Sequence, residues 1–148
     1  MDLDLLSSFL ASAVRVATPL LLAALGETMA ERGGVINLGV EGAMLSGALA
    51  AAIGSSAGGI WAGSALAIVT GVSVAGIFAL IAVRARADQI ITGTAITLGA
   101  IGLTGAVYRR AYGAEGVGLS LPTFPVLPVP GLSRLPVLGP ALFAQSIL

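Results

Sequence analysis

Polar side chains that could contact a hydrophilic solute are few in this sequence, and they lie beside or inside long apolar runs. The stretch ERGGVINLGVEGAMLSGALAA, residues 31–51, places Asn37 and Glu41 at the root of a hydrophobic segment. Asparagine can cap a helix by accepting a bond from a free backbone N–H, and the helix dipole favours a carboxylate in the first turn. Alternatively, both side chains line a route for something polar, because non-helical backbone at membrane depth is tolerated where it lines a cavity.

A second set of polar and small residues shares one face of a later apolar segment. Spacings of four, four, three and four residues put side chains on one side of a helix, and this stripe consists of Gln89, Gly93, Thr97, Ala100 and Thr104. A threonine in a membrane helix can donate its hydroxyl to a carbonyl of the preceding turn at little cost. The stripe predicts either packing between helices or a weakly polar wall of a translocation path.

Arg15 is the ionisable residue that lies deepest in an apolar run. An arginine at the bilayer centre costs about 2.5–3.5 kcal/mol on insertion scales, so we expect Arg15 either to face protein or a cavity, or to reach the interface from a shifted helix. Pro19, four residues later, predicts a bend. The residues predicted to face a path are therefore Asn37, Glu41, Gln89, Thr97 and Arg15.

The residue inventory argues against an enzyme. The chain contains no cysteine, histidine or lysine, and its seven arginines balance seven acids. Serine and threonine therefore have no histidine or lysine base to activate them, a phosphate-binding loop with its lysine is impossible, and the usual zinc or haem ligands are missing. We expect no catalytic residue, no metal and no cofactor. Without a concentrated basic face, we also expect no binding of nucleic acid.

The elements that carry these residues are predicted to be membrane helices. Hydrophobic residues make up 57% of the 148 and charged residues 9%, with a mean hydropathy of +1.03, whereas soluble domains carry about 25% charged residues. A bilayer-spanning helix needs roughly 20 apolar residues, and three runs provide them. The sequence therefore predicts an all-α, polytopic transmembrane helical bundle. Its expected helices cover approximately residues 4–32, 38–53, 60–83 and 89–108.

Glycine and charge mark the expected helix ends. Gly33 and Gly34 end the first helix because glycine adopts the left-handed conformation easily, and Glu27, Glu31 and Arg32 just before them are expected in water or at the lipid headgroups. The stretch GSSAGG, residues 54–59, predicts a tight turn. RARAD, residues 84–88, ends the third helix.

Beyond the fourth helix the sequence changes character. Six of the seven prolines lie between residues 122 and 140, so residues 111–140 are expected to form a loop outside the hydrocarbon, either a stiff connector or a lid at a pore mouth. Residues 141–148 turn apolar again and resemble the start of a fifth helix. We therefore expect residues 1–148 to be a single, truncated transmembrane domain of four spans and part of a fifth.

Small residues recur at positions that suit close helix packing. In lipid, helices associate through small side chains that allow their backbones to approach. Two sets are predicted to form tight helix pairs, one in the second helix and one in the fourth. They are Gly39, Ala43, Gly47 and Ala51, and Gly99, Gly102 and Gly105.

Two long motifs resemble a known family. PLLLAALGETMAERGGVINLGVEGAMLSGALAA, residues 19–51, looks like the N-terminal segment of permease subunits of bacterial ABC importers for simple sugars and nucleosides. These are relatives of the ribose-type permeases, in the group found beside basic-membrane-protein-type lipoprotein receptors. Their pattern reads LGE, then ERxGVxNLGxEGxM. ARADQIITGTAITLGAIGLTGAVYRRAYG, residues 85–113, is similar to the family's cytoplasmic turn and next helix.

The resemblance implies a transport subunit and its partners. The chain would be the N-terminal half of a multi-pass permease in the bacterial inner membrane, working by alternating access. Its implied partners are a second permease subunit, ATP-binding cassette ATPase subunits, an extracytoplasmic substrate-binding protein or lipoprotein, and the bilayer. Arginines divide three to three between the two sides, so charge alone leaves the orientation open. The resemblance places the RARAD turn in the cytoplasm and the proline-rich loop outside.

Two other functions compete with this interpretation. A small self-associating membrane protein, acting as a scaffold or passive pore, would also use glycine-rich helix faces. An ion-coupled secondary transporter is the other alternative. It usually needs an ionisable site inside a span, and Arg15 is the sole ionisable residue deep in one.

Overall fold

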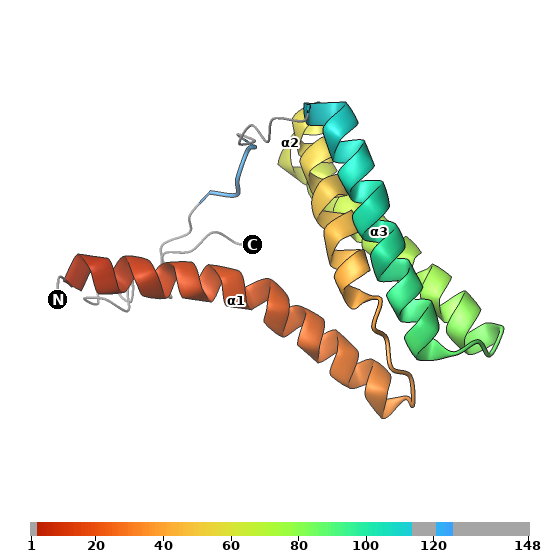
Figure 1. Cartoon of the computed structure of the whole chain (residues 1–148). Coiled ribbons are helices and arrows are strands. Elements are labelled where there is room, and N and C mark those ends of the chain that lie inside the picture. Colours follow the sequence, from red (N-terminus) through yellow and green to blue (C-terminus); the bar gives the residue numbers. More distant parts are fainter. Residues whose placement is uncertain (1–2, 114–120, 126–148) are drawn as a thin grey trace. The chain divides into compact units, whose positions relative to one another are not determined.

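The computed structural model describes residues 3–113 and 121–125, and three long helices account for most of them (Figure 1). The elements are α1 (Leu3–Arg32), α2 (Val40–Phe78), the π-helical η1 (Ala79–Arg84) and α3 (Gln89–Tyr112). The described residues include no strand, which confirms the all-α class. Two compact units can be distinguished: one contains α1 up to Gly26, and the other runs from Glu27 to Pro122.

Three helical stretches are long and apolar enough to cross a membrane. They are Leu5–Arg32, Val40–Arg84 and Gln89–Tyr112. The predicted four spans and the start of a fifth therefore stay a prediction. Residues 126–148, which contain the expected fifth helix and most of the proline-rich loop, lie outside the described residues.

The end of α1 is set by a glycine, as expected. Gly34 has φ +78°, its N–H donates to the carbonyl of Glu31 at 2.9 Å, and the N–H of Val35 donates to that of Ala30 at 3.1 Å. These two bonds form a Schellman motif, which satisfies carbonyls that would otherwise lack a partner at the helix end. The chain therefore leaves α1 by a sharp reversal.

The two helices expected on either side of residues 54–59 form the two parts of α2, which is interrupted by a break. The backbone is non-helical at Gly58 (φ −140°, ψ 17°) and Gly59 (φ 77°, ψ −177°). We call residues 40–57 the first arm of α2 and residues 60–78 the second arm. The expected six-residue turn is thus confined to two glycines, because residues 54–57 continue the helix.

The two arms fold back against each other through glycine. A Cβ added to Gly54 would lie 2.8 Å from Cα of Gly63, and one added to Gly47 would lie 3.5 Å from the carbonyl oxygen of Ala67. No side chain larger than hydrogen fits at Gly54 without displacement. The backbones of the arms therefore approach as closely as small residues allow, which is how helices associate in lipid.

α3 packs beside α2 (Figure 1). It begins at Gln89, where Asp88 caps the helix by accepting the N–H of Ile91 at 2.9 Å. It ends at Tyr112, beyond the expected residue 108, so the connection expected from residue 111 starts later, at Gly113 with φ +87°. Arg109 and Arg110 occupy the last turn, where the helix dipole favours positive charge.

The predicted packing residues have different surroundings. Gly39 is buried against Ile96 of α3, and Gly47 faces the second arm. Ala43 and Ala51 are half-buried. In the described part of the chain nothing lies within 4 Å of a Cβ built on Gly99 or Gly102, and Gly105 has only Arg109 of its own helix nearby. Packing at these three positions stays a prediction.

Candidate functional site

The chain between α1 and α2 is non-helical, and side chains from α1 and α3 accept hydrogen bonds from its backbone. We call residues 35–39 the connecting segment; it is the thin stretch between α1 and α2 in Figure 1. The N–H of Ile36 donates to Oε1 of Gln89 at 2.7 Å. The next N–H, that of Asn37, donates to Oε1 of Glu27 at 2.7 Å. Thus α1 supplies one acceptor, Glu27, and α3 supplies the other, Gln89.

Thr97 extends this support to the next residue of the connecting segment. Its hydroxyl donates to the carbonyl of Leu38 at 3.0 Å. The other bonded threonine hydroxyls of α3 donate to carbonyls of the preceding turn, as expected for membrane helices; these are Thr92, Thr94 and Thr104. Thr97 therefore differs from its neighbours by contacting another part of the chain.

Asn37 closes a local turn rather than capping α2. Its Oδ1 accepts the N–H of Gly39 at 3.0 Å, an Asx turn that gives the backbone a local partner. The N-cap of α2 is Gly39, which has no side-chain capping bond, and the helix begins at Val40. The expectation that Asn37 accepts a backbone N–H near the helix start is met, but Asn37 lies two positions before the N-cap.

Glycine allows α3 to touch the connecting segment. A Cβ added to Gly93 would lie 2.9 Å from the backbone nitrogens of Leu38 and Gly39. One added to Gly42 would lie 3.0 Å from Cα of Thr97. Since Gly93 and Thr97 belong to the stripe predicted on α3, that stripe faces the connecting segment and the start of α2. The stripe therefore packs α3 against the connecting segment and the start of α2.

Glu27 was expected in water or at the headgroups; its side chain is half-buried in the structure, and its depth in the membrane stays a prediction. Its Oε1 accepts the N–H of Asn37. Its Oε2 is buried and has no hydrogen-bond partner in the described part of the chain. A buried acceptor without a donor costs about 1–3 kcal/mol, and more when charged. Glu31 and Arg32, one turn later, are exposed as expected. The difference arises because the chain reverses after Gly34 and covers Glu27.

The structure brings together three of the five residues predicted to face a path. Asn37, Gln89 and Thr97 all contact the connecting segment. Glu41 lies in the first turn of α2 and is exposed, in a position where the helix dipole favours its charge. Arg15 belongs to the other compact unit and is exposed there.

An open groove of about 460 Å³ lies between the first arm of α2 and α3. Its walls are mostly apolar, and its polar groups gather towards the end of α3. The lining residues are Leu45, Ala48, Leu49, Ala52, Thr104, Gly105, Tyr108 and Arg109. The ring of Tyr108 lies 5.3 Å from that of Tyr112, centroid to centroid, at 47°. A groove of this kind can hold an apolar or ring-shaped group, but it has no acid and base pair.

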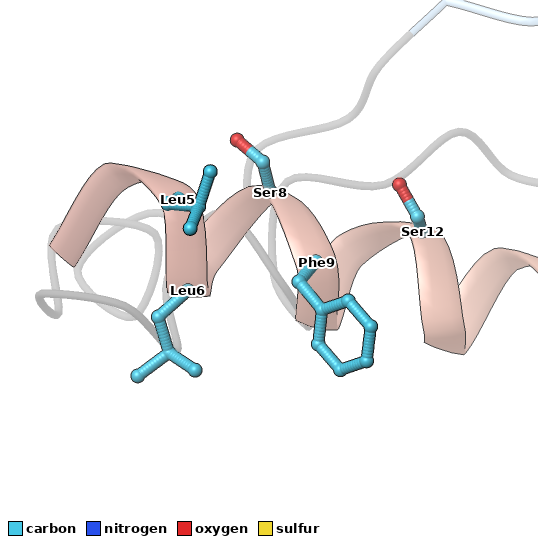
Figure 2. Close-up of a pocket in the computed structure, with 5 residues that line it drawn as sticks. All are labelled: Leu5, Leu6, Ser8, Phe9 and Ser12. Atoms are coloured by element: carbon cyan, nitrogen blue, oxygen red, sulfur yellow. The ribbon is translucent and has the colours of Figure 1, made fainter. Parts of the chain in front are cut away.

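A second hollow lies against the first turns of α1. Figure 2 shows that Ser8 and Ser12 extend towards one side of the helix, and Leu6 and Phe9 towards the other. Polar groups from different elements do not converge there among the described residues. No group of three or more histidine, cysteine or acidic side chains in the described ranges could hold a metal ion.

Two residues of the site escaped sequence reasoning for different reasons. Asp88 directly precedes an apolar helix, and an aspartate in that place is a recognised N-cap signal; it could have been found. Glu27 gave no such signal. Its contact with Asn37 depends on the reversal after α1 and on the path of the connecting segment, which helical periodicity does not describe.

Comparison with known proteins places this arrangement among transporters. Residues 9–123 match the family described as "Branched-chain amino acid transport system / permease component". TsgC13 of Haloferax volcanii, named as a glucose ABC transporter permease protein, is 37% identical over 145 residues, which cover 95% of this chain and 43% of TsgC13. NupQ of Bacillus subtilis, a guanosine ABC transporter permease protein, is 34% identical, over 98% of this chain and 48% of NupQ.

A third relative has the same kind of name. NupC of Lactococcus lactis subsp. cremoris, a nucleoside ABC transporter permease protein, is 32% identical over 89% of this chain and 44% of NupC. The chain therefore spans less than half the length of these curated relatives. No solved structure matches the chain.

Proposed function

Because the chain belongs to the family of branched-chain amino acid transport system permease components, we propose that it is the N-terminal part of a permease subunit in an ATP-driven ABC importer. The observation that carries the proposal is the match of that family to residues 9–123, which include all of α2 and α3. The subunit transports rather than catalyses; ATP hydrolysis takes place on partner subunits.

The proposed cargo is a simple sugar or a nucleoside. Three relatives are named for glucose, guanosine and nucleosides, and all of these carry a hydroxyl-rich ring. The chemistry around the connecting segment agrees, because Asn37, Gln89 and Thr97 offer neutral amide and hydroxyl groups.

We propose that the two arms of α2 cross the membrane separately. Residues 40–57 extend about 27 Å at about 1.5 Å per residue, and the hydrocarbon core is about 30 Å thick. Residues 60–78 and η1 together are longer. With α1 and α3 this gives four spans. The connecting segment and the turn after η1 then face the cytoplasm, and Gly58 and Gly59 face outwards.

The proposed mechanism is alternating access. ATP binding and hydrolysis on the cassette subunits tilt the helices of two permease subunits, so that the path opens to each side in turn. A substrate-binding protein or lipoprotein delivers the cargo outside the inner membrane. We propose that Asn37, Glu41, Gln89 and Thr97 border the cytoplasmic mouth of the path; a path-facing role for Arg15 stays a prediction from the sequence.

The test is uptake by the complete transporter. The full-length permease, its partner subunits and its binding protein are reconstituted in proteoliposomes, and entry of labelled guanosine, glucose and leucine is followed with and without ATP. We expect ATP-dependent accumulation of guanosine or glucose but not of leucine. Accumulation of leucine alone would overturn the proposed cargo, and flux that is independent of ATP would favour a passive pore.

A further inference from the structure

We propose that Glu27 is a positioning residue of the transport cycle: its carboxylate oxygen, and not its charge, holds the connecting segment in place for α2. This inference rests on the proposed function. It adds a residue that the path assignment does not contain, and it gives Glu27 a role that can be separated from contact with the cargo.

The first observation is the placement of two acceptors on consecutive backbone amides. Oε1 of Glu27 accepts the N–H of Asn37, and Oε1 of Gln89 accepts the N–H of Ile36, each at 2.7 Å. The connecting segment is therefore bonded to α1 through Glu27 and to α3 through Gln89.

The second observation is that the connecting segment is non-helical, with the Asx turn of Asn37 as a local bond. Its amides lie between the end of α1 and the start of α2, and Gly39, the N-cap of α2, has no side-chain cap. Without Glu27, the N–H of Asn37 would lose its partner at the point where the direction of α2 is set. The bonds from Gln89 and Thr97 would then have to hold Asn37 and Glu41 in position relative to α3 without the support of α1.

The third observation concerns the other carboxylate oxygen. Oε2 of Glu27 is buried and has no hydrogen-bond partner among the described residues. The bond to Asn37 uses only Oε1. An amide in place of the carboxylate keeps that acceptor and removes a buried charge, so Glu27→Gln preserves what the segment needs. Glu27→Asp keeps the charge but shortens the side chain by one methylene, so its oxygen no longer reaches Asn37.

Uptake kinetics of the complete transporter test the expectation that glutamine can replace Glu27 whereas aspartate cannot. We expect Glu27→Ala and Glu27→Asp to lower Vmax about fivefold to tenfold, the effect of losing one hydrogen bond. KM should stay within about twofold, because Glu27 does not touch the cargo. Glu27→Gln should keep both values within about twofold of the wild type. If Glu27→Ala does not accumulate in the membrane, Glu27→Asp and Glu27→Gln still give the decisive comparison.

A double-mutant cycle adds a second readout. Because Glu27 and Gln89 hold neighbouring amides of one segment, Gln89→Ala should cost much less in the Glu27→Ala background than alone, as expected for residues with a shared partner. Additive losses would mean that the two side chains act independently. That result would contradict the proposal that Glu27 and Gln89 together hold the connecting segment.

Amide hydrogen exchange separates this inference from the proposed transport function. It is measured on the purified full-length permease without cargo or ATP. Peptides covering residues 35–39 should exchange about tenfold faster in Glu27→Ala than in the wild type, since a lost bond lowers local stability, and Glu27→Gln should match the wild type. If the wild-type complex does not transport but exchange behaves this way, the transport proposal fails and the positioning holds.

The outcomes that overturn the positioning role are specific. Unchanged exchange and an unchanged Vmax in Glu27→Ala would show that the connecting segment does not need the acceptor. Equal impairment of Glu27→Gln and Glu27→Ala would show that the charge acts, through a donor to Oε2 from outside the described residues. A change in KM alone would place Glu27 in contact with the cargo.

Discussion

The backbone of α3 lies close to the connecting segment at Gly93, so one added methyl group tests how tightly that segment is held. A Cβ at this position would lie 2.9 Å from Leu38 N, from Leu38 Cβ and from Gly39 N. Two of these atoms belong to the backbone, which cannot rotate away as a flexible side chain can. In Gly93→Ala the segment or α3 must therefore move.

The magnitude follows from comparison with Gly99→Ala, six residues later in the same helix. Nothing lies within 4 Å of a Cβ at Gly99 in the described part of the chain. Both substitutions gain about 0.8–1.0 kcal/mol of helix propensity, but overpacking costs Gly93→Ala typically about 1–3 kcal/mol. Since the propensity term cancels, Gly93→Ala should unfold about 1–3 kcal/mol more easily than Gly99→Ala.

The assay is reversible unfolding of the purified full-length permease in mixed micelles, followed by circular dichroism as the fraction of denaturing detergent rises. Amide exchange of residues 35–39 is measured on the same samples. Gly93→Ala should speed that exchange, whereas Gly99→Ala should not. If the two variants show the same stability and the same exchange, the close contact between α3 and the connecting segment does not exist in the protein.

Three further predictions concern other contacts. Gly63→Ala should destabilise the fold by about 1–3 kcal/mol relative to Gly71→Ala, because a Cβ at Gly63 would collide with Ser55 Oγ while Gly71 has open space; unfolding of both variants in mixed micelles decides this. Asp88→Ala should cost about 0.5–2 kcal/mol by removing the cap of α3, with Asp88→Asn close to the wild type; equal stability of the two variants would contradict the capping role. Asn37→Asp retains the oxygen that closes the Asx turn but loses the amide donor, so it should impair uptake by the complete transporter without changing stability. If Asn37→Asp has the same uptake kinetics as the wild type, Asn37 does not line the path.

Features encoded by local sequence were predictable. Gly34 ends α1 because its left-handed conformation is open to glycine and rarely to other residues. The stripe of α3 was found from its spacing, since residues three and four apart share a face whatever that face contacts. The break in α2 was placed in a glycine-rich stretch, although the helix uses only Gly58 and Gly59 for it.

What could not be predicted depends on segments far apart in the chain. The spacing of Gln89 and Thr97 showed that they share a face, but not that their partners are Ile36 and Leu38, more than fifty residues earlier. Glu27 looked like a surface acid because its local sequence is polar. Its partial burial results from the reversal of the chain at Gly34, and helical periodicity does not predict where a non-helical segment lies.

The most direct test of the central claim is ATP-driven uptake by the complete transporter in sealed proteoliposomes. The full-length permease is combined with its partner subunits and binding protein, and labelled guanosine and glucose are offered at equal concentration inside and outside. We predict net accumulation of one of them only when ATP hydrolysis is possible. Equilibration at the same rate with a hydrolysis-deficient ATPase subunit, or the absence of any uptake by a correctly assembled complex, would contradict assignment of this chain to an importer permease for sugars or nucleosides.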